Sequence, residues 1–473
     1  MQRQQNDSTA PEASIYAAFL EAFFRELEAR DVRYCVPRNF EGLPARIEGD
    51  VDVLVRRGQL RRAEAALENA APGHFVLRRV RRNGHLLVWI GRADELRRAS
   101  REGRRAEVLE VDLVTDLQWM GVPYQDAITV LSGARRERGI WVASPEDEAS
   151  HILCHAILDK RCMKPVYRET IAAIVASLGA EAFAPLVHRV GAKIVGRLFE
   201  ALQSGDDAVL LALRRDLIRG LLVTHPSAPP RWLGFVAART LRRAGAGVSP
   251  PGVLIATAGP DGVGKSTLLA NIRLVLEGTF EPVSDQYMGW REFVLPTKRL
   301  LSWLQEVLSV RQQGREKVPE KSATAALSSG HDEPEGPMSW THNFSVLHYF
   351  VDLWARYLLQ VRPALARGGL VLCDRYFFDV LVQEVLVCEN PWLRGLLLAL
   401  TPKPTVTALL SGDPEVIAAR KHEMSAQKTA RDMGSLMVLK GRRGVLDLDA
   451  QKPVEENLEA VLRGIFPRWR ETR

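Results

Sequence analysis

Hydrophobic and polar positions alternate differently in successive parts of the chain, and this predicts where its elements and domains lie. In residues 1–144, short apolar runs alternate with stretches of helical spacing, which predicts one mixed sheet with a few helices. From 145 to 225 the apolar residues recur at helical spacing throughout. Residues 226–251 are rich in Pro, Gly, Ala and Arg and are expected to form a linker with a short helix inside. From 252 to 473, continuous apolar runs alternate with helical patterns, as in a parallel α/β sheet.

The individual elements follow from the same pattern. In the first part, helices are expected at 15–28 and around 60–69, and strands at 32–36, 51–55, 74–80, 85–90 and 108–114. The third and fourth of these strands flank Asn83-Gly84, a dipeptide that favours the tight turn of a hairpin. In the last part, buried strands are expected at 253–258, 369–374, 405–410 and 444–449. Residues 311–337 are polar and charged, and they are expected to be a mobile insertion.

One glycine-rich segment stands between a predicted strand and a predicted helix. Its sequence, Gly259-Pro-Asp-Gly-Val-Gly-Lys-Ser-Thr267, fits the phosphate-binding pattern G-x-x-x-x-G-K-[ST]. The apolar run 253–258 leads into it, and the apolar-periodic stretch 268–276 leads out. In such a loop the glycines let backbone N–H groups surround a phosphate, and the helix N-terminus adds partial positive charge.

This loop predicts a nucleotide site whose residues have distinct roles. The candidate nucleotide-binding residues are Gly259, Asp261, Gly262, Val263, Gly264, Lys265, Ser266 and Thr267. Lys265 would reach the β- and γ-phosphates of ATP, and the Ser266 hydroxyl would ligate Mg²⁺. ATP and Mg²⁺ are therefore the expected cofactors. An ordinary glycine-rich turn between a strand and a helix is the alternative.

Further charged residues of the last part would complete a phosphotransferase site. Asp374 ends the strand 369–374, and ligands bind beyond the carboxyl ends of parallel strands, so it would approach Mg²⁺ or orient the acceptor. Arg375 would neutralise an acceptor phosphate, and the basic segment that starts at Arg420 suits a lid over the transferring group. The alternatives are that Asp374 caps a helix and that Arg420 lies on a solvated helix end. Asp379, five residues past Asp374, would face the same cleft or be a surface acid, and a surface acid is favoured.

These segments together resemble the thymidylate kinase family of nucleoside-monophosphate kinases. The matching pieces are residues 259–267, Asp374-Arg375-Tyr376, the basic segment from Arg420, and the ending at 449–453. The resemblance implies a P-loop domain with a doubly wound parallel sheet over 252–473. It also implies that Lys265, Asp374, Arg375 and Arg420 are catalytic residues and that residues 450–453 lie near the adenine.

The acceptor part of this family pattern is different here. Thymidylate kinases usually carry a Phe-Pro-x-Arg segment that grips the acceptor nucleotide, and the corresponding stretch in this chain is 285–291. Arg291 would inherit the phosphate contact. The acceptor therefore stays open between a nucleoside monophosphate and another small phosphorylated metabolite.

Acidic residues on two predicted N-terminal strands form a second candidate site. Asp50 and Asp52 stand two residues apart at the second strand, so both project from the same face. Asp112, with Glu110, stands on the strand 108–114. Three acids on neighbouring strands suit two-metal nucleotidyl transfer, because they bind the Mg²⁺ ions that bridge the attacking oxygen and the triphosphate.

This arrangement resembles the nucleotidyltransferase superfamily, which pairs Asp-x-Asp with a third strand acid. The resemblance implies an α+β nucleotidyltransferase-like domain over 1–144, followed by a helical segment, with Asp50, Asp52 and Asp112 as metal ligands. The family's Gly-Ser dipeptide, which holds the triphosphate, is replaced by Pro37-Arg38-Asn39. Three interpretations stay open: an active transferase, a retained fold with weak or lost catalysis, and a surface strand with alternating acids.

The helical segment and the linker carry further candidate groups. His151 and His155 share a helical face, and histidines at the edge of the core are favoured over metal ligands because no third ligand stands at a telling spacing. Five nearby residues would meet a phosphate or form a solvated face: Lys160, Arg161, Lys164, Tyr167 and Arg168. The segment 231–243 mixes Trp, Leu and Phe with arginines, so it would lie on an anionic membrane surface or dock onto one of the domains.

Composition narrows the partners and the compartment. The chain of 473 residues has a net charge of +7, which suits phosphorylated ligands without selecting one. It lacks a dense polybasic tract with interleaved aromatics, so no nucleic-acid partner is expected. Five scattered cysteines without a C-x-x-C pair indicate neither a disulfide framework nor a zinc site and favour a reducing, cytoplasmic location. Neither a signal peptide nor an uninterrupted apolar stretch of membrane-spanning length is expected.

The sequence therefore predicts ATP-dependent phosphoryl transfer to a nucleoside monophosphate or another small phosphorylated acceptor. Two other functions remain open. One is a nucleotide-binding regulatory or assembly protein with degenerate catalytic domains, and the other is a metal-dependent nucleotidyltransferase that the P-loop domain supports. The oligomeric state stays open as well, with a homodimer among the alternatives.

Overall fold

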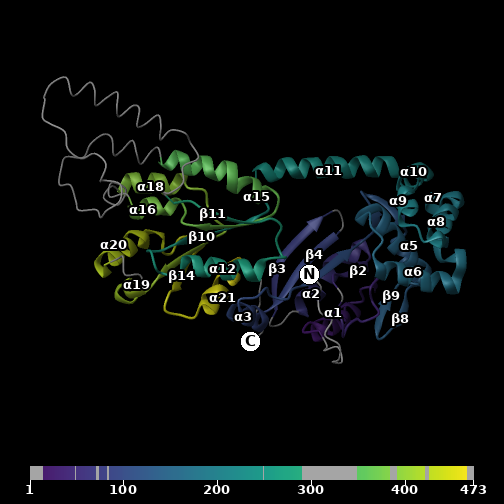
Figure 1. The fold of residues 1–473 in the computed structure, drawn as a ribbon, viewed down its shortest axis with the longest axis horizontal. Helices are drawn as coiled ribbons and strands as arrows, with labels where there is room; N and C mark the ends of the chain where they lie inside the picture. Colours follow the sequence, from purple (N-terminus) through teal and green to yellow (C-terminus); the bar gives the residue numbers. More distant parts are fainter. Residues whose placement is uncertain are drawn as a thin grey trace, which may run out of the picture. The chain divides into compact units, whose positions relative to one another are not determined.

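The structure of the chain is a computed structural model, and it describes residues 14–47, 49–70, 74–82, 85–248, 250–289, 349–383, 391–420 and 425–465. The fold is α/β, with one mixed and one parallel sheet of five strands (Figure 1). Contacts divide the chain into two compact units, one up to Gly245 and the other over Ala246–Ile465. Some expected features lie outside the described residues: the Asn83-Gly84 turn, the insertion 311–337, Arg291, and the basic residues that follow Arg420.

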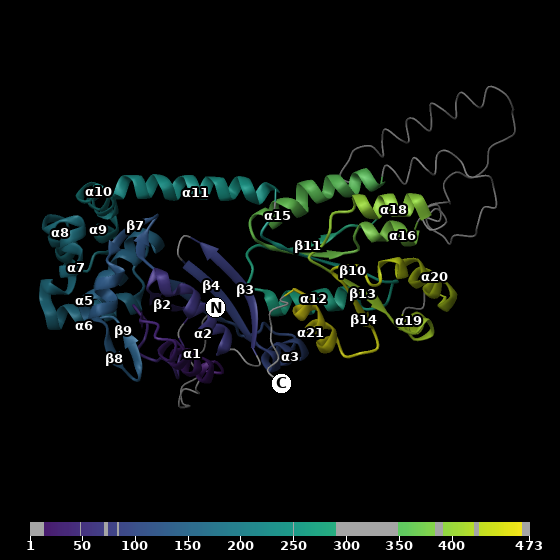
Figure 2. The ribbon, with the colours of Figure 1, turned by 180° about the vertical axis from the view of Figure 1, so that it is seen from behind.

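The first unit is built on a mixed sheet with the strand order β1-β2-β5-β4-β3 (Figure 2). Its strands are β1 (Tyr34–Cys35), β2 (Val51–Val55), β3 (His74–Arg82), β4 (His85–Arg92) and β5 (Leu109–Val114). β2 and β5 are parallel, and the other neighbours are antiparallel. Each strand lies close to its predicted position, because runs of β-branched and other apolar residues mark all five.

The two faces of this sheet differ because side chains alternate along each strand. Val51 and Val53 of β2 lie in a buried core with Phe23 of α1 (Ala17–Ala29) and Leu67 of α2 (Leu60–Asn69). Asp52, between the two valines, therefore projects from the opposite face. The parallel register pairs Asp52 with Asp112 of β5, so the predicted acids do stand on neighbouring strands.

Two short hairpins in this unit were not predicted. β6 (Leu117–Trp119) pairs with β7 (Val122–Gln125), and β8 (Arg135–Glu137) pairs with β9 (Ile140–Val142). Their turns are Met120-Gly121 and Arg138-Gly139, and all four of these residues have positive φ. Turns of this kind match the twist of paired strands, but they are usually marked by Asn or Asp before the Gly. Both hairpins were missed because Met120 and Arg138, rather than Asn or Asp, precede the glycines of their turns.

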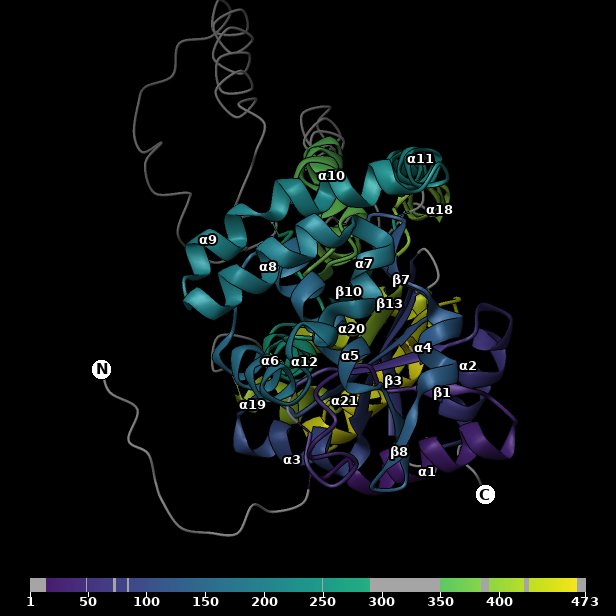
Figure 3. The ribbon, with the colours of Figure 1, turned by 90° about the vertical axis from the view of Figure 1, so that its right-hand side faces the viewer.

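The rest of the first unit is helical, as predicted for residues 145–225. After α3 (Ala93–Glu102) and α4 (Ala127–Gly133), the chain forms α5 (Pro145–Cys154), a π-helical turn (His155–Lys160), α6 (Pro165–Leu178), α7 (Ala184–Val190), α8 (Ala192–Ser204), α9 (Asp207–Ala212) and α10 (Arg214–Thr224). These last helices lie side by side (Figure 3). They share one apolar core with the β6–β7 hairpin, in which Phe183 and Leu198 are fully buried.

One stretch of the described chain, Pro165–Val190, is long and apolar enough to cross a membrane by length and composition alone. The sequence pattern had not indicated such a stretch, because charged residues interrupt it. In the structure it comprises α6 and α7 with a 3-10 segment, Gly179–Phe183, between them. Ile171 and Leu186 from this stretch lie in the buried core of the first unit. The core helices of many proteins pass the same test of length and composition.

The predicted linker is mainly a helix. α11 (Ala228–Val248) is 21 residues long, so the expectation of a short helix within a linker was wrong about its length. Trp232 packs against the helical core of the first unit, and Phe235 lies against Gly121 of the β6–β7 turn. These contacts favour docking for the first half of the helix over the membrane-surface alternative.

The second unit contains a parallel sheet with the order β11-β12-β10-β13-β14. Its strands are β10 (Val253–Ala258), β11 (Val283–Tyr287), β12 (Leu370–Asp374), β13 (Val406–Ser411) and β14 (Val445–Asp449), and every neighbouring pair is parallel. Four of the five were predicted, and β10, β12 and β13 were predicted from their continuous apolar runs. β11 was not, because Ser284, Asp285 and Gln286 make it polar at this end of the sheet.

Helices cover both faces of this parallel sheet (Figure 1). α12 (Lys265–Leu276) and α21 (Val454–Ile465) lie on one face. The helical stretch 349–361, α15 (Arg362–Ala366), α16 (Val380–Gln383) and α18 (Pro391–Leu400) lie on the other, where Phe350, Leu353 and Leu397 enter the core. α19 (Pro414–Arg420) and α20 (Ala426–Leu436) follow β13 and pack on one another. The sheet is therefore wound with helices on both sides.

Candidate functional site

The glycine loop, residues 259–267, lies at the point where the connections of the parallel sheet diverge. After β10 the chain crosses to β11 at one edge, whereas after β12 it passes β10 to reach β13 on the other side. In open α/β sheets ligands bind at the carboxyl ends of the strands beside such a point. The loop follows β10 and Asp374 ends β12, so the two predicted groups lie on adjacent strands at this edge.

Glycine is required at particular positions of this loop. A Cβ on Gly259 would lie 2.8 Å from the Leu410 carbonyl oxygen and 2.9 Å from Val263 Cγ1, both too close for real contacts. Gly264 has φ of +101°, which a residue with a side chain rarely adopts, and it immediately precedes α12. No atom lies within 4 Å of a Cβ built on Gly264, so the space beside it is open. The backbone thus leaves an open space at the N-terminus of α12, a helix that is held in the core by its buried apolar residues.

Lys265 lies inside the glycine loop. Its Nζ donates hydrogen bonds to the carbonyl oxygens of Gly259 at 2.9 Å and Pro260 at 2.7 Å, and it lies 3.5 Å from Asp261 Oδ1. The side chain is buried, and this burial lowers the pKa of the ammonium group. A buried ammonium that is held mainly by neutral carbonyls can exchange these partners for the stronger acceptors of a phosphate.

Ser266 and Asp374 meet although 108 residues separate them. The Ser266 hydroxyl donates a hydrogen bond of 2.6 Å to Asp374 Oδ2. Asp374 Oδ1 is buried and has no hydrogen-bond partner among the described residues. A hydroxyl and a carboxylate oxygen are the ligands that Mg²⁺ prefers, with water and phosphate oxygens in its remaining positions. The pair therefore fits one Mg²⁺ ion, although no group of three or more His, Cys, Asp or Glu residues in the described chain does so.

Arg375 is held by two carboxylates. Its Nη1 donates to Asp379 Oδ1 at 2.8 Å, and its Nη2 pairs with Asp261 Oδ1 in the glycine loop. The backbone of Arg375 has φ of +60°, a conformation that side chains other than Gly, Asn and Asp adopt rarely. Such strain persists where the surroundings hold it in place, and the two carboxylates do so here. Arg375 therefore connects the end of β12 to the glycine loop.

The prediction that Asp379 is a surface acid was wrong. Only 9% of its side chain is exposed, and the 3-10 turn Phe377–Asp379 brings it within hydrogen-bond distance of Arg375. Burial raises the pKa of Asp379 to about 6, although the Arg375 guanidinium opposes this. Asp379 Oδ2 is buried and has no hydrogen-bond partner among the described residues. The carboxyl is therefore part of the site and titrates close to neutral pH.

Another acid near this site was not singled out in the sequence. Asp432 of α20 is buried, and its burial raises its pKa. Lys428 and Arg431 on the same helix lower that pKa, and the charges of Asp261 and Arg375 also act on it. α20 therefore brings both acidic and basic groups toward the glycine loop. No sequence motif marks this helix.

Arg420 is exposed at the end of a helix, which agrees with the alternative that the sequence left open, and its role as a lid cation stays a prediction. It ends α19, and its Nη1 donates a hydrogen bond of 3.3 Å to the carbonyl oxygen of Ala450. The structure thus brings it to residues 450–453, the segment expected near the adenine.

A buried ion pair supports the end of β11. Arg356 Nε donates to Asp352 Oδ2 at 2.6 Å, and these side chains are 1% and 0% exposed. Arg356 Nη1 donates to the carbonyl oxygen of Gly289 at 3.0 Å, and the Tyr349 hydroxyl donates to that of Met288 at 3.1 Å. The helix therefore fixes the backbone that leaves β11, where the acceptor segment was expected. Charges four residues apart in an otherwise apolar helix are the signal that could have revealed this pair.

The three N-terminal acids have partners other than a metal ion. Arg38 Nη2 lies 2.6 Å from Asp52 Oδ2 and 3.5 Å from Asp50 Oδ2. Asp112 faces His85 Nδ1 at 3.5 Å instead. Burial raises the pKa of Asp52 to about 7, although Arg38 opposes it. Asp112 Oδ1 is buried and has no hydrogen-bond partner among the described residues. The metal site shared by all three acids stays a prediction, and the Arg38 guanidinium lies near both of the first two carboxylates.

The histidines of the helical segment belong to the core. His151 is buried, and its Nδ1 lies 3.1 Å from the Tyr124 hydroxyl. His155 packs edge-on against Tyr167 and lies 3.5 Å from Asp159. Burial lowers the pKa of both histidines. The burial of His151 and the ring contacts of both histidines agree with the place at the edge of the core that the sequence favoured.

Comparisons with known proteins add no family to this picture. No protein-family model matches the chain, and no curated protein matches it. The geometry of the two units is therefore the basis for any statement about function.

Proposed function

We propose that the second unit is a P-loop phosphotransferase, similar to thymidylate kinases, that transfers the γ-phosphate of ATP to a small phosphorylated acceptor. A nucleoside monophosphate is the first candidate for that acceptor. The observation that carries the proposal is the hydrogen bond between Ser266 and Asp374 beside Lys265. Residues from two separate segments meet there in the arrangement that Mg²⁺ and nucleotide phosphates require.

The glycine loop would bind the triphosphate of ATP. Its backbone N–H groups and the N-terminus of α12 provide the positive potential, and the open space beside Gly264 leaves room for phosphate oxygens. Lys265 would exchange the carbonyl oxygens of Gly259 and Pro260 for β- and γ-phosphate oxygens, which accept stronger hydrogen bonds from an ammonium group. Arg420, at residues 450–453, would contact the adenine end of the nucleotide.

Ser266 and Asp374 would hold the metal ion. Mg²⁺ would supply positive charge that offsets the negative charge developing on the phosphates during transfer. The Ser266 hydroxyl oxygen would ligate it directly, and Asp374 would hold it directly or through a water. This role gives the buried Asp374 Oδ1 a partner that it lacks among the described residues.

Arg375 and its two carboxylates would position the acceptor. The guanidinium would neutralise a phosphate of the acceptor, and Asp261 and Asp379 hold it in its strained backbone conformation. The backbone after β11, fixed by Arg356, would form the adjacent wall. The protein then contributes position and charge, which supply most of the catalysis in phosphoryl transfer.

A regulatory nucleotide-binding protein is the second candidate function. The observation that favours it is the engagement of Arg375 with Asp261 and Asp379, which leaves the guanidinium bound to carboxylates. In that case ATP would bind to the glycine loop without multiple rounds of transfer. Metal-dependent nucleotidyl transfer by the first unit is not proposed, because Arg38 holds Asp50 and Asp52.

The test is transfer of labelled γ-phosphate from ATP to a panel of nucleoside monophosphates, with dTMP first. Lys265→Ala should remove transfer, whereas Lys403→Ala, which changes an exposed lysine of the same unit, should leave it unchanged. Transfer to one acceptor that Lys265→Ala abolishes supports the kinase. ATP binding without transfer to any acceptor supports the regulatory function. Transfer retained in Lys265→Ala contradicts both.

A further inference from the structure

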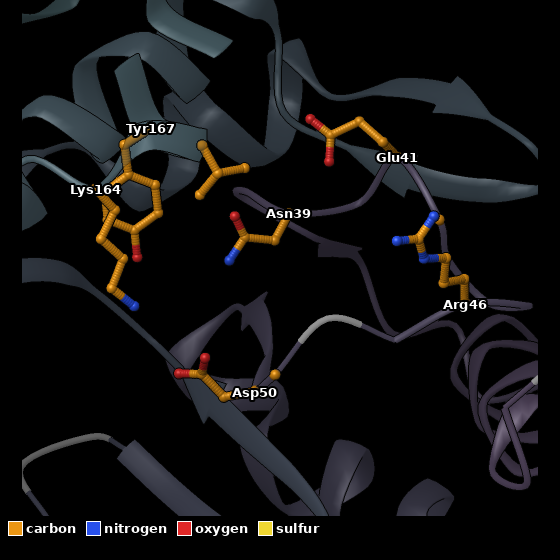
Figure 4. A pocket seen from close by; sticks show the side chains of 9 residues that line it. Asn39, Glu41, Arg46, Asp50, Lys164 and Tyr167 are labelled. Atoms are coloured by element: carbon orange, nitrogen blue, oxygen red, sulfur yellow. The ribbon is translucent and has the colours of Figure 1, made fainter. Parts of the chain in front are cut away.

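A cavity of the first unit is lined by several polar side chains and by Asp50, one of the acids that were expected to bind metal (Figure 4). Its volume is about 170 Å³. The loop after β1 contributes Asn39, Glu41 and Arg46, the start of β2 contributes Asp50, and the start of α6 contributes Lys164 and Tyr167. Three separate segments therefore converge on one small space.

Arg38 contacts two of the residues that line this cavity, Asp50 and Tyr167. It is 4% exposed, and its Nε and Nη2 donate to Asp52 Oδ2 at 2.7 and 2.6 Å. Its Nη1 donates to the Tyr167 hydroxyl at 2.6 Å. One guanidinium thus joins the sheet to α6, because Asp52 belongs to β2 and Tyr167 to α6.

The same guanidinium occupies the position that a divalent cation bridging Asp50 Oδ2 and Asp52 Oδ2 would need. A Mg²⁺ ion requires oxygen ligands at about 2.0–2.1 Å in an octahedral arrangement. Arg38 Nη2 is already 2.6 Å from Asp52 Oδ2 and 3.5 Å from Asp50 Oδ2. A metal ion bridging these two oxygens would overlap with Nη2. The positive charge that the acids need is therefore part of the chain.

Two donors that line this cavity have no partner in the protein. Among the residues that the structure describes, neither the Lys164 ammonium nor the Asn39 side-chain amide makes a hydrogen bond or an ion pair; Lys164 Nζ only approaches the Tyr167 ring, at 5.5 Å from its centre. Figure 4 shows both groups on the side of the cavity where the Tyr167 hydroxyl and the Asp50 carboxylate also lie. Ammonium and amide donors suit a phosphate, and the carboxylate of Asp50 suits a hydroxyl group.

We propose that this cavity is a metal-independent binding site for a small phosphomonoester that carries hydroxyl groups, in which Arg38 takes the place of a divalent cation between Asp50 and Asp52. Lys164 and Asn39 donate to the phosphate oxygens, and Asp50 accepts from a hydroxyl. The site is separate from the proposed phosphotransferase site, and its test does not depend on phosphoryl transfer.

Calorimetric titration of the full chain with ribose 5-phosphate, in EDTA and then in Mg²⁺, tests this proposal. The wild type should bind equally in both conditions. Lys164→Ala should weaken binding roughly tenfold or more, the factor that corresponds to the loss of one charge-assisted hydrogen bond. Asn39→Ala should weaken it less. Lys193→Ala, which changes an exposed lysine of α8, should bind as the wild type does.

The glycine loop also attracts phosphates, so Lys265→Ala is titrated in parallel. Binding of ribose 5-phosphate to the cavity is the binding that Lys164→Ala removes and that Lys265→Ala retains. Ribose without phosphate should not bind, and inorganic phosphate should bind more weakly than ribose 5-phosphate. Binding that needs Mg²⁺, equal binding by Lys164→Ala and Lys193→Ala, or no binding at millimolar concentrations would overturn the proposal.

A second measurement tests the role of Arg38 directly. Arg38→Ala removes the guanidinium and leaves Asp50 and Asp52 without their cation. Mn²⁺ alone should then bind to this variant and raise its unfolding temperature, whereas it should leave the chain with Arg38 unchanged; both chains carry Asp374→Asn, so that the proposed metal site of the second unit does not contribute. A chain with Arg38 that binds Mn²⁺ as tightly as the variant would show that the acids form a metal site after all.

Discussion

Replacing Asp379 by Asn removes the buried carboxyl that pairs with Arg375 and leaves a side chain of nearly the same size. Burial raises the pKa of Asp379 from its ordinary value of 3.8 to about 6. A difference of about two pKa units corresponds to about 3 kcal/mol. That free energy is the amount by which the pH dependence of stability should differ between the wild type and the variant.

The folded protein binds the proton of Asp379 more tightly than the unfolded chain does, and this fixes the sign of the change in stability with pH. Because the folded protein has the higher pKa, the contribution of Asp379 to the free energy of unfolding is complete below about pH 4. It is lost as the pH rises through about 6. The Asn variant carries no such proton. Relative to Asp379→Asn, the wild type should therefore become less stable by about 3 kcal/mol between pH 4 and pH 7.

The assay is hydrogen exchange across a denaturant series at several pH values, read on peptides from β12. This reading follows the second unit separately, since a chain of two units need not unfold in one step. Glu456→Gln changes an exposed carboxylate on α21 and serves as the control, for which the difference from the wild type should stay constant. A constant difference for Asp379→Asn as well would refute the reasoning that burial controls this carboxyl.

Three further predictions concern the second unit. Ser266→Ala and Asp374→Asn should each lower Mg²⁺-dependent phosphoryl transfer roughly tenfold or more but leave ATP binding in EDTA little changed, as steady-state rates and calorimetry would show. Gly259→Ala places a methyl group 2.8 Å from a backbone oxygen of β13, so the loop must shift and calorimetry should detect weaker ATP binding. Unchanged ATP binding would contradict the proposal that the glycine loop binds the triphosphate. Arg356→Met removes the guanidinium that neutralises the buried Asp352, so the free energy of unfolding should fall by about 3–5 kcal/mol; denaturant titration should show that adding Asp352→Leu recovers much of this loss.

The strands of the parallel sheet were predictable because their burial leaves a direct trace in the sequence. A strand covered on both faces needs a continuous apolar run, and β10, β12 and β13 each have one. β11 was missed because its side chains are only partly buried and polar residues fill its centre. The short hairpins were missed because Met120 and Arg138 adopt positive φ without the usual Asn or Asp.

The candidate sites were predictable to the extent that motifs mark them. The spacing within residues 259–267, and the acid at the end of β12, brought Lys265 and Asp374 to attention before any contact was known. The residues that contact Lys265 and Asp374 could be identified only from the folded structure. Asp379 is buried and lies within hydrogen-bond distance of Arg375, which its sequence spacing does not reveal.

For the N-terminal acids, the sequence predicted the acids but not the residue that pairs with them. Alternation along the strand placed Asp52 and Asp112 on one face, and the register confirms this. The residue that decides their chemistry is Arg38, which precedes them on another segment and reaches Asp52 through the fold. Pro37-Arg38-Asn39 differed from the family pattern in the sequence, but only the structure shows that the arginine fills the space between two carboxylates.

The most direct test of the proposed phosphotransferase is the number of γ-phosphates that each chain transfers from ATP to its acceptor in the presence of Mg²⁺. The account predicts many transfers per wild-type chain and essentially none for Lys265→Ala, while both proteins fold alike. Transfer by Lys265→Ala at the wild-type rate, or no more than one transfer per wild-type chain with any acceptor, would contradict it.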